Sequence, residues 1–423
     1  MRFLHTSDWH LGQTLHGFER TYEHQCFLDW LVDTIAAEKA DALLVSGDIF
    51  DNANPSAVAQ KQLYHFLQQA KARAPHLNIV LIAGNHDSPG RLEAPGPLLE
   101  VFDTTVVGHI RRKDDGEIDL GQLVVPLRNY DGKNYDGKNR DGDIAVWCIA
   151  IPFLRPGDVP RVETDGDAYV EGVARLYRQA LEYVQQRRQP GQAIVALGHC
   201  HMVGGKVSAE SERNIVIGGA EALSAAIFDP VIAYAALGHL HQAQIVGKQE
   251  HLRYSGSPLP LSFAEIDYAH QILRVDLDGE SVQNIAAIPV PRAVGLLRVP
   301  RQPAPVEDVL AALTALDLPE ASDLRTHPYL EVRVQLDAPE PGLRARVEAA
   351  LENKPVRLAR IETSVAKNPD GVAAPISLDD LHRLQPEEIF KRLYQSKYGS
   401  NAPAEQLAAF AELLHEPGES AAP

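Results

Sequence analysis

Six short apolar segments in the first two thirds of the chain predict the strands of a layered domain. All six are rich in Val, Ile, Leu and Ala, which is typical of strands that are buried on both faces. They are RFLHTSD (residues 2–8), DALLVSGD (41–48), NIVLIAGN (78–85), DIAVWCIAIP (143–152), QAIVALGH (192–199) and IAYAALGH (232–239).

Two amphipathic stretches between the first three segments predict helices, because apolar residues recur in them at helical spacing. These residues are Tyr22, Phe27, Trp30, Leu31 and Ile35 in the first stretch, and Val58, Leu63, Phe66, Leu67 and Ala70 in the second. Alternating strands and helices of this kind predict an α/β domain.

The character of the chain changes at a cluster of prolines between Pro289 and Pro305. Beyond it the pattern reads strand, helix, strand, helix, strand, which predicts a small α+β domain. The five segments are VGLLRV (294–299), VEDVLAALTAL (306–316), YLEVRVQL (329–336), GLRARVEAALEN (342–353) and PVRLARIET (355–363).

A second stretch rich in Pro, Gly and Ala, residues 366–376, precedes a capping-box pattern at Ser377 and Asp380. Two helices are predicted after it, at 385–399 and 404–416, so we expect three parts with bounds 1–290, 291–366 and 367–423. The apolar positions of these helices are expected to be cut off from the main core and to need a partner surface. They are Ile389, Phe390, Leu393 and Tyr394 in the first helix, and Leu407, Phe410 and Leu414 in the second.

Length, charge and cysteine content limit the possible classes of protein. The chain has 423 residues and a formal net charge of −17, which counts against a free-standing nucleic-acid binder. Cys26, Cys148 and Cys200 are scattered along the chain, which predicts a reducing compartment, the cytoplasm. No run approaches the ~18 apolar residues of a membrane span, so no membrane association is expected.

One low-complexity piece, residues 128–143, repeats Asp-Gly-Lys-Asn. Its turn-forming residues predict a surface hairpin or flexible insertion. A calcium loop is the less favoured alternative, because the full acidic spacing and the closing Glu are missing.

Five of the apolar segments end in polar side chains that bind metal ions. Because the carboxyl ends of such strands form one edge of an α/β sheet, these side chains are expected to converge there. The segments end in Asp8 and His10, in Asp48, in Asn85, His86 and Asp87, in His199, and in His239 and His241. One lone histidine after a strand is more often structural, but five such strand ends point to a site.

The spacing and chemistry of these residues predict two metal ions. In extended backbone, residues i and i+2 point the same way, so Asp8 and His10 could aim into one pocket. Glycines such as Gly47 and Gly84 are expected to permit sharp turns. Carboxylate, carboxamide and imidazole ligands without thiolate suit Mn, Fe or Zn. Seven ligands are too many for one ion, so two ions sharing a bridging carboxylate are expected.

The segments SDWHLG, GDIFD, GNHDS, GH and GHLH, in this order, resemble the five motifs of calcineurin-like metallophosphoesterases. The flanking IPFLRP and RYSGSPLPLSF resemble in particular the SbcD family of double-strand-break repair nuclease subunits. The resemblance implies a metallophosphoesterase β-sandwich flanked by helices, followed by a small capping domain and C-terminal helices. It also implies a DNA nuclease that works with an SMC-like ATPase, SbcC, as a homodimer within a heterotetramer.

The family pattern assigns a role to each residue of the site. It places Asp8, His10, Asp48 and His241 on one ion. Asp48 is shared with a second ion, which Asn85, His199 and His239 also hold. The family resemblance implies that both ions are Mn(II). His86 is implied to be a catalytic residue that protonates the leaving oxygen or steadies the phosphate. Asp87 is expected to orient an imidazole. His201, in the first Gly-His-x-His copy, matches no ligand position and is expected to be a bystander.

Two other functions remain open on the motifs alone. A phosphodiesterase or nucleotide pyrophosphatase acting on a small substrate has the same metal residues. The nuclease is favoured because a small-substrate hydrolase has no need of the domains after residue 290. A non-catalytic scaffold is disfavoured because every ligand position is filled. Candidate DNA contacts are His16, Arg20, Arg91 and Arg155.

Overall fold

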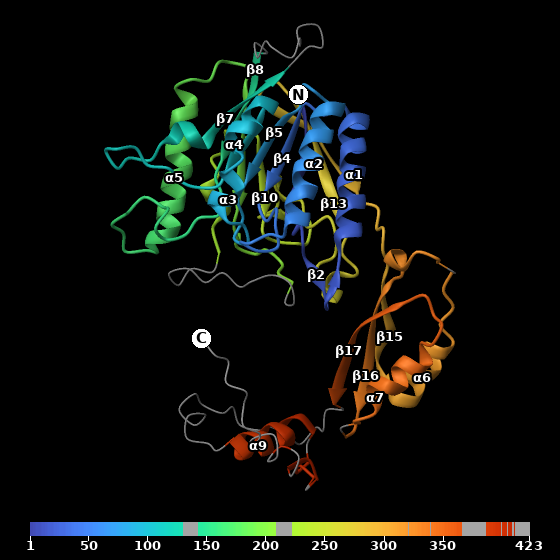
Figure 1. The fold of residues 1–423 in the computed structure, drawn as a ribbon. Coiled ribbons are helices and arrows are strands. Elements are labelled where there is room, and N and C mark those ends of the chain that lie inside the picture. Colours follow the sequence, from blue (N-terminus) through green and yellow to red (C-terminus); the bar gives the residue numbers. More distant parts are fainter. Residues whose placement is uncertain are drawn as a thin grey trace. The chain divides into compact units, whose positions relative to one another are not determined.

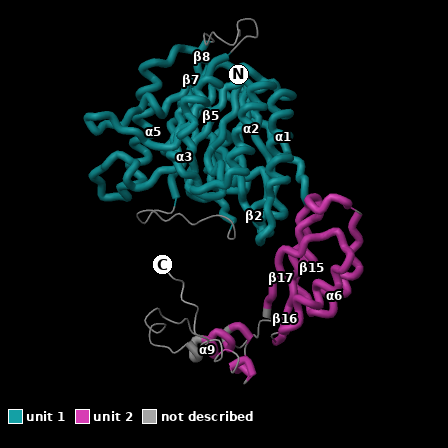
Figure 2. Tube along the Cα trace, viewed as in Figure 1, with its two compact units in different colours: residues 1–294 teal, residues 295–423 magenta. Residues whose placement is uncertain are grey.

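The computed structural model describes residues 1–129, 143–208, 222–319, 321–338, 340–365, 386–398, 400–403, 405–407 and 410. The chain forms two compact units, Met1–Val294 and Gly295–Pro423 (Figure 2).

The first sheet of unit 1 has six strands in the order β14-β13-β1-β4-β5-β6. Four of them run parallel: β1 (Arg2–Thr6), β4 (Ala42–Ser46), β5 (Asn78–Ile82) and β6 (Thr104–Val107). The antiparallel strands β13 (Gln271–Asp278) and β14 (Ser281–Pro289) complete one edge. In this register Leu43 pairs with Leu4 on one side and with Ile79 on the other.

The second sheet of unit 1 also has six strands, in the order β11-β12-β10-β9-β8-β7. Its parallel strands are β12 (Gln249–Tyr254), β10 (Tyr234–Gly238), β9 (Ala193–His199) and β8 (Asp143–Ala150). The outer strands β11 (Gln244–Val246) and β7 (Val124–Asn129) are antiparallel to their neighbours.

Side chains alternate along the strands between two buried cores. Along β4, Leu44 joins a cluster shared with the strands of the second sheet, whereas Leu43 and Val45 join a cluster shared with helices α1 (Thr21–Glu38) and α2 (Ala57–Arg73). Helix α5 (Ala168–Gln185) packs against the second sheet (Figure 1). The predicted β-sandwich flanked by helices is therefore confirmed, and all six predicted strands form.

Shorter elements connect these layers. They are β2 (Thr14–Leu15), β3 (Phe18–Glu19), α3 (Pro89–Glu93), α4 (Gly96–Leu99) and the 3₁₀ turns η1 (Glu100–Phe102), η2 (Leu120–Leu123), η3 (Ala225–Ile227) and η4 (Phe263–Glu265). One detail of the predicted helices is wrong: Val58, counted among the apolar positions of the second helix, is 53% exposed, and the adjacent Ala59 is buried in its place.

Unit 2 contains a three-stranded parallel sheet in the order β15-β16-β17, and two helices share its core. Its elements are β15 (Leu296–Pro305), α6 (Val306–Thr314), η5 (Leu324–Thr326), β16 (Tyr329–Leu336), α7 (Leu343–Ala350), β17 (Arg357–Val365) and α9 (Pro386–Tyr398). The predicted strand-helix-strand-helix-strand order is confirmed.

Several predicted features lie outside the described residues. These are nearly all of the repeat at 128–143, the linker at 367–385 with its capping box, and most of the second tail helix. In the part of the chain that the structure describes, no helix is long and apolar enough to cross a membrane.

Candidate metal centre

Both sheets contribute residues to one cluster at the carboxyl ends of their parallel strands. Asp8 and His10 follow β1, Asp48 follows β4, Asn85 follows β5, His199 ends β9, and His239 and His241 follow β10. Six of these seven side chains are buried and Asn85 is half-buried. The structure therefore brings together all seven residues that the sequence placed at the strand ends.

The two sheets touch directly at this edge. The Ser46 hydroxyl donates a hydrogen bond to the Ala236 carbonyl at 2.9 Å, which joins the end of β4 to β10. A Cβ atom built on Gly238 would lie 1.8 Å from the Ser46 carbonyl oxygen, so only glycine permits this approach. This close packing brings Asp48, after β4, next to His239, after β10.

Left-handed backbone aims the acidic and imidazole side chains, and the extended geometry expected from their spacing is wrong. Asp8, His10 and Asp48 have φ of 55°, 48° and 50°, and His239 has φ of 105°. L-residues rarely adopt these values, and strain of this kind persists where tertiary contacts impose it. Here the Asp8 amide donates to the Gly47 carbonyl at 3.0 Å, and the His10 amide donates to the Asp48 carbonyl at 3.0 Å.

Two overlapping groups of donor atoms can each hold a metal ion. Asp8, His10 and His241 form the first, and Asp8, Asp48 and His199 form the second, with ligand atoms within 4.8 Å of one another in each. Asp8 is the residue that both groups contain. Asp48 belongs to the second group, and its Oδ2 lies 3.3 Å from His199 Nε2 of that group and 3.6 Å from His10 Nε2 of the first.

Asn85 and His10 show that the cluster fits cations. The Asn85 Oδ1 faces two imidazole nitrogens, at 2.9 Å from His199 Nε2 and 3.1 Å from His239 Nδ1. The buried His10 Nε2 has no hydrogen-bond partner among the residues that the structure describes, and an unpartnered buried nitrogen is costly unless a ligand satisfies it. Oxygen and nitrogen donors without thiolate match divalent metal ions such as Mn, Fe or Zn.

Three imidazoles are fixed in orientation through their Nδ1 atoms. His241 Nδ1 lies 2.8 Å from Glu265 Oε1, His10 Nδ1 lies 3.3 Å from Asp51 Oδ1, and His199 Nδ1 lies 2.8 Å from the Ser46 carbonyl oxygen. Donation of the Nδ1 proton to each oxygen leaves Nε2 with a lone pair that faces the site.

Glu265 and Asp51 were not predicted as site residues. Glu265 lies in η4, beyond the last motif, and no local pattern distinguishes it from a surface acid. Asp51, in contrast, ends the GDIFD motif and could have been found there.

His86 contacts the same cluster without occupying its centre. Its amide donates to Asp48 Oδ1 at 2.8 Å, and its Nδ1 lies 2.7 Å from the Asp51 carbonyl oxygen. The half-buried ring packs edge-on against His10, with centroids 4.8 Å apart. A third donor group, of His10, Asp51 and His86, is also close enough to hold an ion. His201 belongs to none of the three groups found among the described residues.

Asp87 holds backbone and does not orient an imidazole, so that expectation is wrong. Its carboxylate accepts hydrogen bonds from the amides of Gly84, Ile49 and Phe50 at 2.8, 3.1 and 2.9 Å. Burial, followed by the charge of Asp48, raises the Asp87 pKa to about 6. Asp87 therefore ties the turn after β5 to the turn that contains Asp48.

The pKa values of the central pair are strongly perturbed when no metal is bound. Burial alone raises the Asp48 pKa, but the adjacent imidazoles, His199 first among them, outweigh burial and hold it well below its usual value. Burial lowers the pKa of His199, whereas Asp48 and Asp8 raise it, to about 9 overall. Asp48 and His199 therefore form a carboxylate–imidazolium pair whose proton a cation must displace.

Of the four candidate DNA contacts, one is buried and three are exposed. Arg20 is 1% exposed, and its guanidinium is held by Glu23 and the Pro260 carbonyl, so the prediction that it contacts DNA is wrong. His16, Arg91 and Arg155 are exposed.

Comparison with known proteins identifies two matching family models. Residues 1–243 match the calcineurin-like phosphoesterase model, and residues 292–398 match a model described as type 5 capsule protein repressor C-terminal domain. The chain is 39% identical to the SbcD subunit of nuclease SbcCD from Rhodobacter capsulatus over 395 residues, which is 92% of this chain and 93% of the relative. It is 34% identical to that of Escherichia coli K12 over 408 residues, 93% and 92% of the two chains, and 35% identical to that of Bacillus subtilis over 289 residues, 65% and 66%.

Proposed function

The chain belongs to the SbcD family of nuclease subunits within the calcineurin-like phosphoesterases, and we propose that it degrades double-stranded DNA ends and opens DNA hairpins and single strands. It is a metal-dependent nuclease, which hydrolyses phosphodiester bonds. The DNA structures that it cleaves, and the dependence of duplex-end cleavage on ATP, are what we propose. The convergence of seven metal-binding side chains around Asp48 is the observation that supports it. Hydrolysis of a small phosphodiester is the weaker alternative, because two relatives named as nuclease subunits align with nearly the whole chain.

We assign one ion to Asp8, His10, Asp48 and His241, and a second to Asp48, Asn85, His199 and His239. The first set is supported by the donor group of Asp8, His10 and His241. Asp48 Oδ2 lies within 3.6 Å of an imidazole nitrogen of each set, and Asn85 Oδ1 faces both imidazoles of the second set. Two bound ions supply the Lewis acidity that activates water and offsets charge on the phosphate. We take Mn(II) as the metal, since the mixed carboxylate and imidazole donors suit it.

His86 is assigned the transfer of a proton to the leaving oxygen. Its Nδ1 proton is donated to the Asp51 carbonyl at 2.7 Å, which leaves Nε2 as the atom that gains and releases a proton. The His86 amide also donates to Asp48 Oδ1, which places the ring beside the bridging carboxylate.

The test is a cleavage assay with purified chain, Mn(II) and hairpin DNA, with and without the ATPase subunit SbcC, beside a small phosphodiester. We expect hairpin opening in Mn(II), degradation of duplex ends only with SbcC and ATP, and loss of all cleavage in Asp48→Asn. Efficient hydrolysis of the small phosphodiester without cleavage of any DNA would favour the alternative.

The tail helix α9 is proposed to bind SbcC. Leu393 is 59% exposed on α9, whereas Tyr394 is 6% exposed and Phe390 stacks on Phe410 with ring centroids 4.4 Å apart. An amphipathic helix that exposes an apolar side chain suits a groove on a partner. The relatives are subunits of a nuclease named SbcCD, so SbcC is the partner that we assign.

We also propose a cytoplasmic location, because all three cysteines are free.

Truncation after Asp370 tests this docking role. The truncated chain should keep Mn(II)-dependent cleavage of simple substrates but should no longer co-purify with SbcC or respond to ATP. Unchanged affinity for SbcC would show that the tail is not the docking element.

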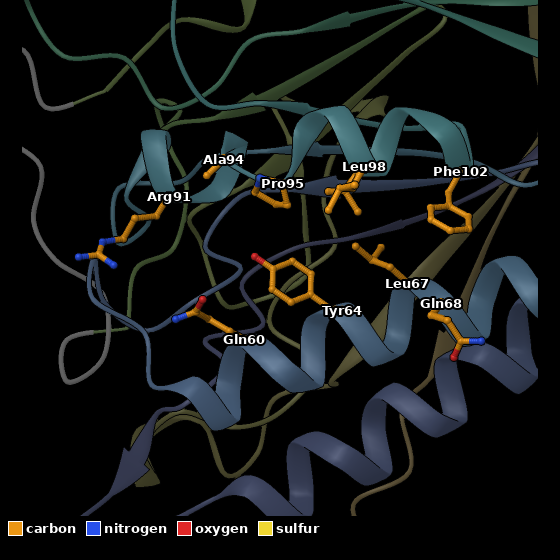
Figure 3. A pocket seen from close by; sticks show the side chains of 10 residues that line it. Gln60, Tyr64, Leu67, Gln68, Arg91, Ala94, Pro95, Leu98 and Phe102 are labelled. Atoms are coloured by element: carbon orange, nitrogen blue, oxygen red, sulfur yellow. The ribbon is translucent and has the colours of Figure 1, made fainter.

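We also propose that two copies of the chain associate through unit 1, within a heterotetramer. Large apolar side chains are exposed there: Leu98 (71%), Val101 (70%) and Phe102 (48%). Leu98 and Phe102 line a groove of about 540 Å³, in which they and Pro95 face Tyr64 and Leu67 of α2 (Figure 3). Exposed apolar surface of this kind usually marks a binding interface.

Sedimentation velocity tests the dimer. Leu98→Glu should convert the dimer to a monomer, because it buries a charge in the interface. Leu324→Glu is the matched control, since Leu324 is 72% exposed in unit 2. A monomeric wild-type chain, or a dimer that survives Leu98→Glu, would refute this interface.

A further inference from the structure

The imidazoles of the two proposed metal positions have different hydrogen-bond partners. Those of the first position, His10 and His241, are both backed by carboxylates, Asp51 and Glu265. That of His199, in the second position, is backed by the neutral carbonyl of Ser46. A partner carboxylate raises the basicity of a metal-binding imidazole more than a neutral carbonyl does.

Glu265 is fully buried, and both of its carboxylate oxygens have partners. One carboxylate oxygen faces His241 Nδ1 at 2.8 Å, and the other accepts a hydrogen bond from the Leu261 amide at 2.7 Å. Both oxygens are therefore held in place, and the charge stays in a dry environment next to the imidazole. Charges interact strongly in such surroundings.

The direct ligands divide their charge more evenly between the two positions. Asp8 lies close to donor atoms of both positions, and Asp48 Oδ2 lies 3.3 Å from His199 Nε2 and 3.6 Å from His10 Nε2. The difference therefore rests on Asp51 and Glu265, the carboxylates that face the imidazoles of the first position.

From this asymmetry we propose that the two positions fill in sequence, the His10–His241 position first and tightly, the His199–His239 position second and weakly. Glu265 and Asp51 are the positioning residues that set this difference, acting through the imidazoles that they hold. The proposal rests on the ligand assignment given under the proposed function. The second ion is then exchangeable, and its supply limits the activity.

Titration of the full chain with Mn(II), by calorimetry and electron paramagnetic resonance, tests the order of filling. The wild type should bind two equivalents in two resolved steps, and one equivalent should give the signal of isolated ions without magnetic coupling. Glu265→Gln should weaken the first step about 10–100-fold, because loss of a carboxylate that orients a ligand imidazole typically costs that much in metal affinity.

Three further variants make the result specific. Asp51→Asn, at a partly exposed residue, should weaken the first step and serves if Glu265→Gln does not fold. Asn85→Asp adds a charge to the second position and should strengthen the second step. Glu280→Gln is the matched control: Glu280 lies in the turn between β13 and β14, at the opposite end of β13 from the site, and should leave both steps unchanged.

The outcomes separate this inference from the proposed function. Two equal wild-type affinities, or a first step that neither Glu265→Gln nor Asp51→Asn weakens, would overturn the sequential filling while leaving the two-metal site intact. Binding of fewer than two equivalents at saturation would instead refute the ligand assignment itself.

Discussion

Substitution of Gly238 by alanine perturbs the site without changing any metal ligand. Gly238 ends β10 and pairs with His199, the last residue of β9. An added Cβ would lie 1.8 Å from the Ser46 carbonyl oxygen, whereas real Cβ contacts essentially never fall below 3.0 Å. The ends of β4 and β10 must therefore move apart by about 1.2 Å, because the obstructing atom belongs to the backbone.

The size of the effect follows from this displacement. Overpacking of a dense interior costs about 1–3 kcal/mol, and a clash with backbone belongs at the upper end. Asp48 and His239 follow the two strands that separate, so the distances between the proposed ligands change as well. A misplacement of about 1 Å can cost about 10²-fold in rate. We expect Gly238→Ala to lose about 3 kcal/mol of unfolding free energy and about 100-fold in hydrolysis.

Urea unfolding and Mn(II)-dependent cleavage of single-stranded DNA measure the two effects. Gly96→Ala is the matched control, since no heavy atom lies within 4 Å of its added Cβ. The control should retain wild-type stability and rate. Wild-type values for Gly238→Ala would show that the two sheets do not meet at this edge as described.

Four further predictions concern the centre itself. His86→Asn should keep both metal ions, measured by elemental analysis, but lose about 10²–10⁴-fold in hydrolysis, as expected for a proton donor; loss of metal would make it a ligand. Asp48→Asn should deplete both positions, because a neutral amide bridges cations poorly, and full occupancy would refute the bridge. His201→Gln should leave activity unchanged while His199→Gln does not, and equal damage in a cleavage assay would contradict the assignment. Metal affinity should rise as the pH is raised toward about 9, because His199 keeps its proton below its raised pKa and a cation must displace that proton. Calorimetry in buffers of different ionisation heat should show proton release on metal binding. A pH-independent metal affinity would contradict this prediction.

The strands and the set of site residues could be predicted from the sequence because both depend on local signals. Strands such as β4 and β5 are continuous apolar runs, and the polar residues that end them stand out against those runs. Local patterns do not say which strands pair, so the division into two sheets came only from the resemblance. The backbone at Asp8 and His10 was mispredicted because tertiary hydrogen bonds, such as that from the Asp8 amide to the Gly47 carbonyl, impose left-handed conformations on them.

Contacts between distant segments account for the other misses. Glu265 meets His241 only because η4 folds back on the end of β10, and a single acidic residue after an apolar stretch carries no signal of that contact. Arg20 looked like a free basic residue, but the loop that contains Pro260 covers it. Asp51 was within reach of the sequence argument, since it closes a motif whose other acid, Asp48, was assigned.

Two ions that share Asp48, at the edge where the two sheets meet, are the basis of the proposed hydrolysis. Crystals grown with Mn(II) and measured at the manganese absorption edge locate such ions directly. We expect two anomalous peaks, both next to Asp48. One should also lie next to His10 and His241, and the other next to Asn85, His199 and His239. A single peak, or a peak between His10, Asp51 and His86, would contradict the ligand assignment.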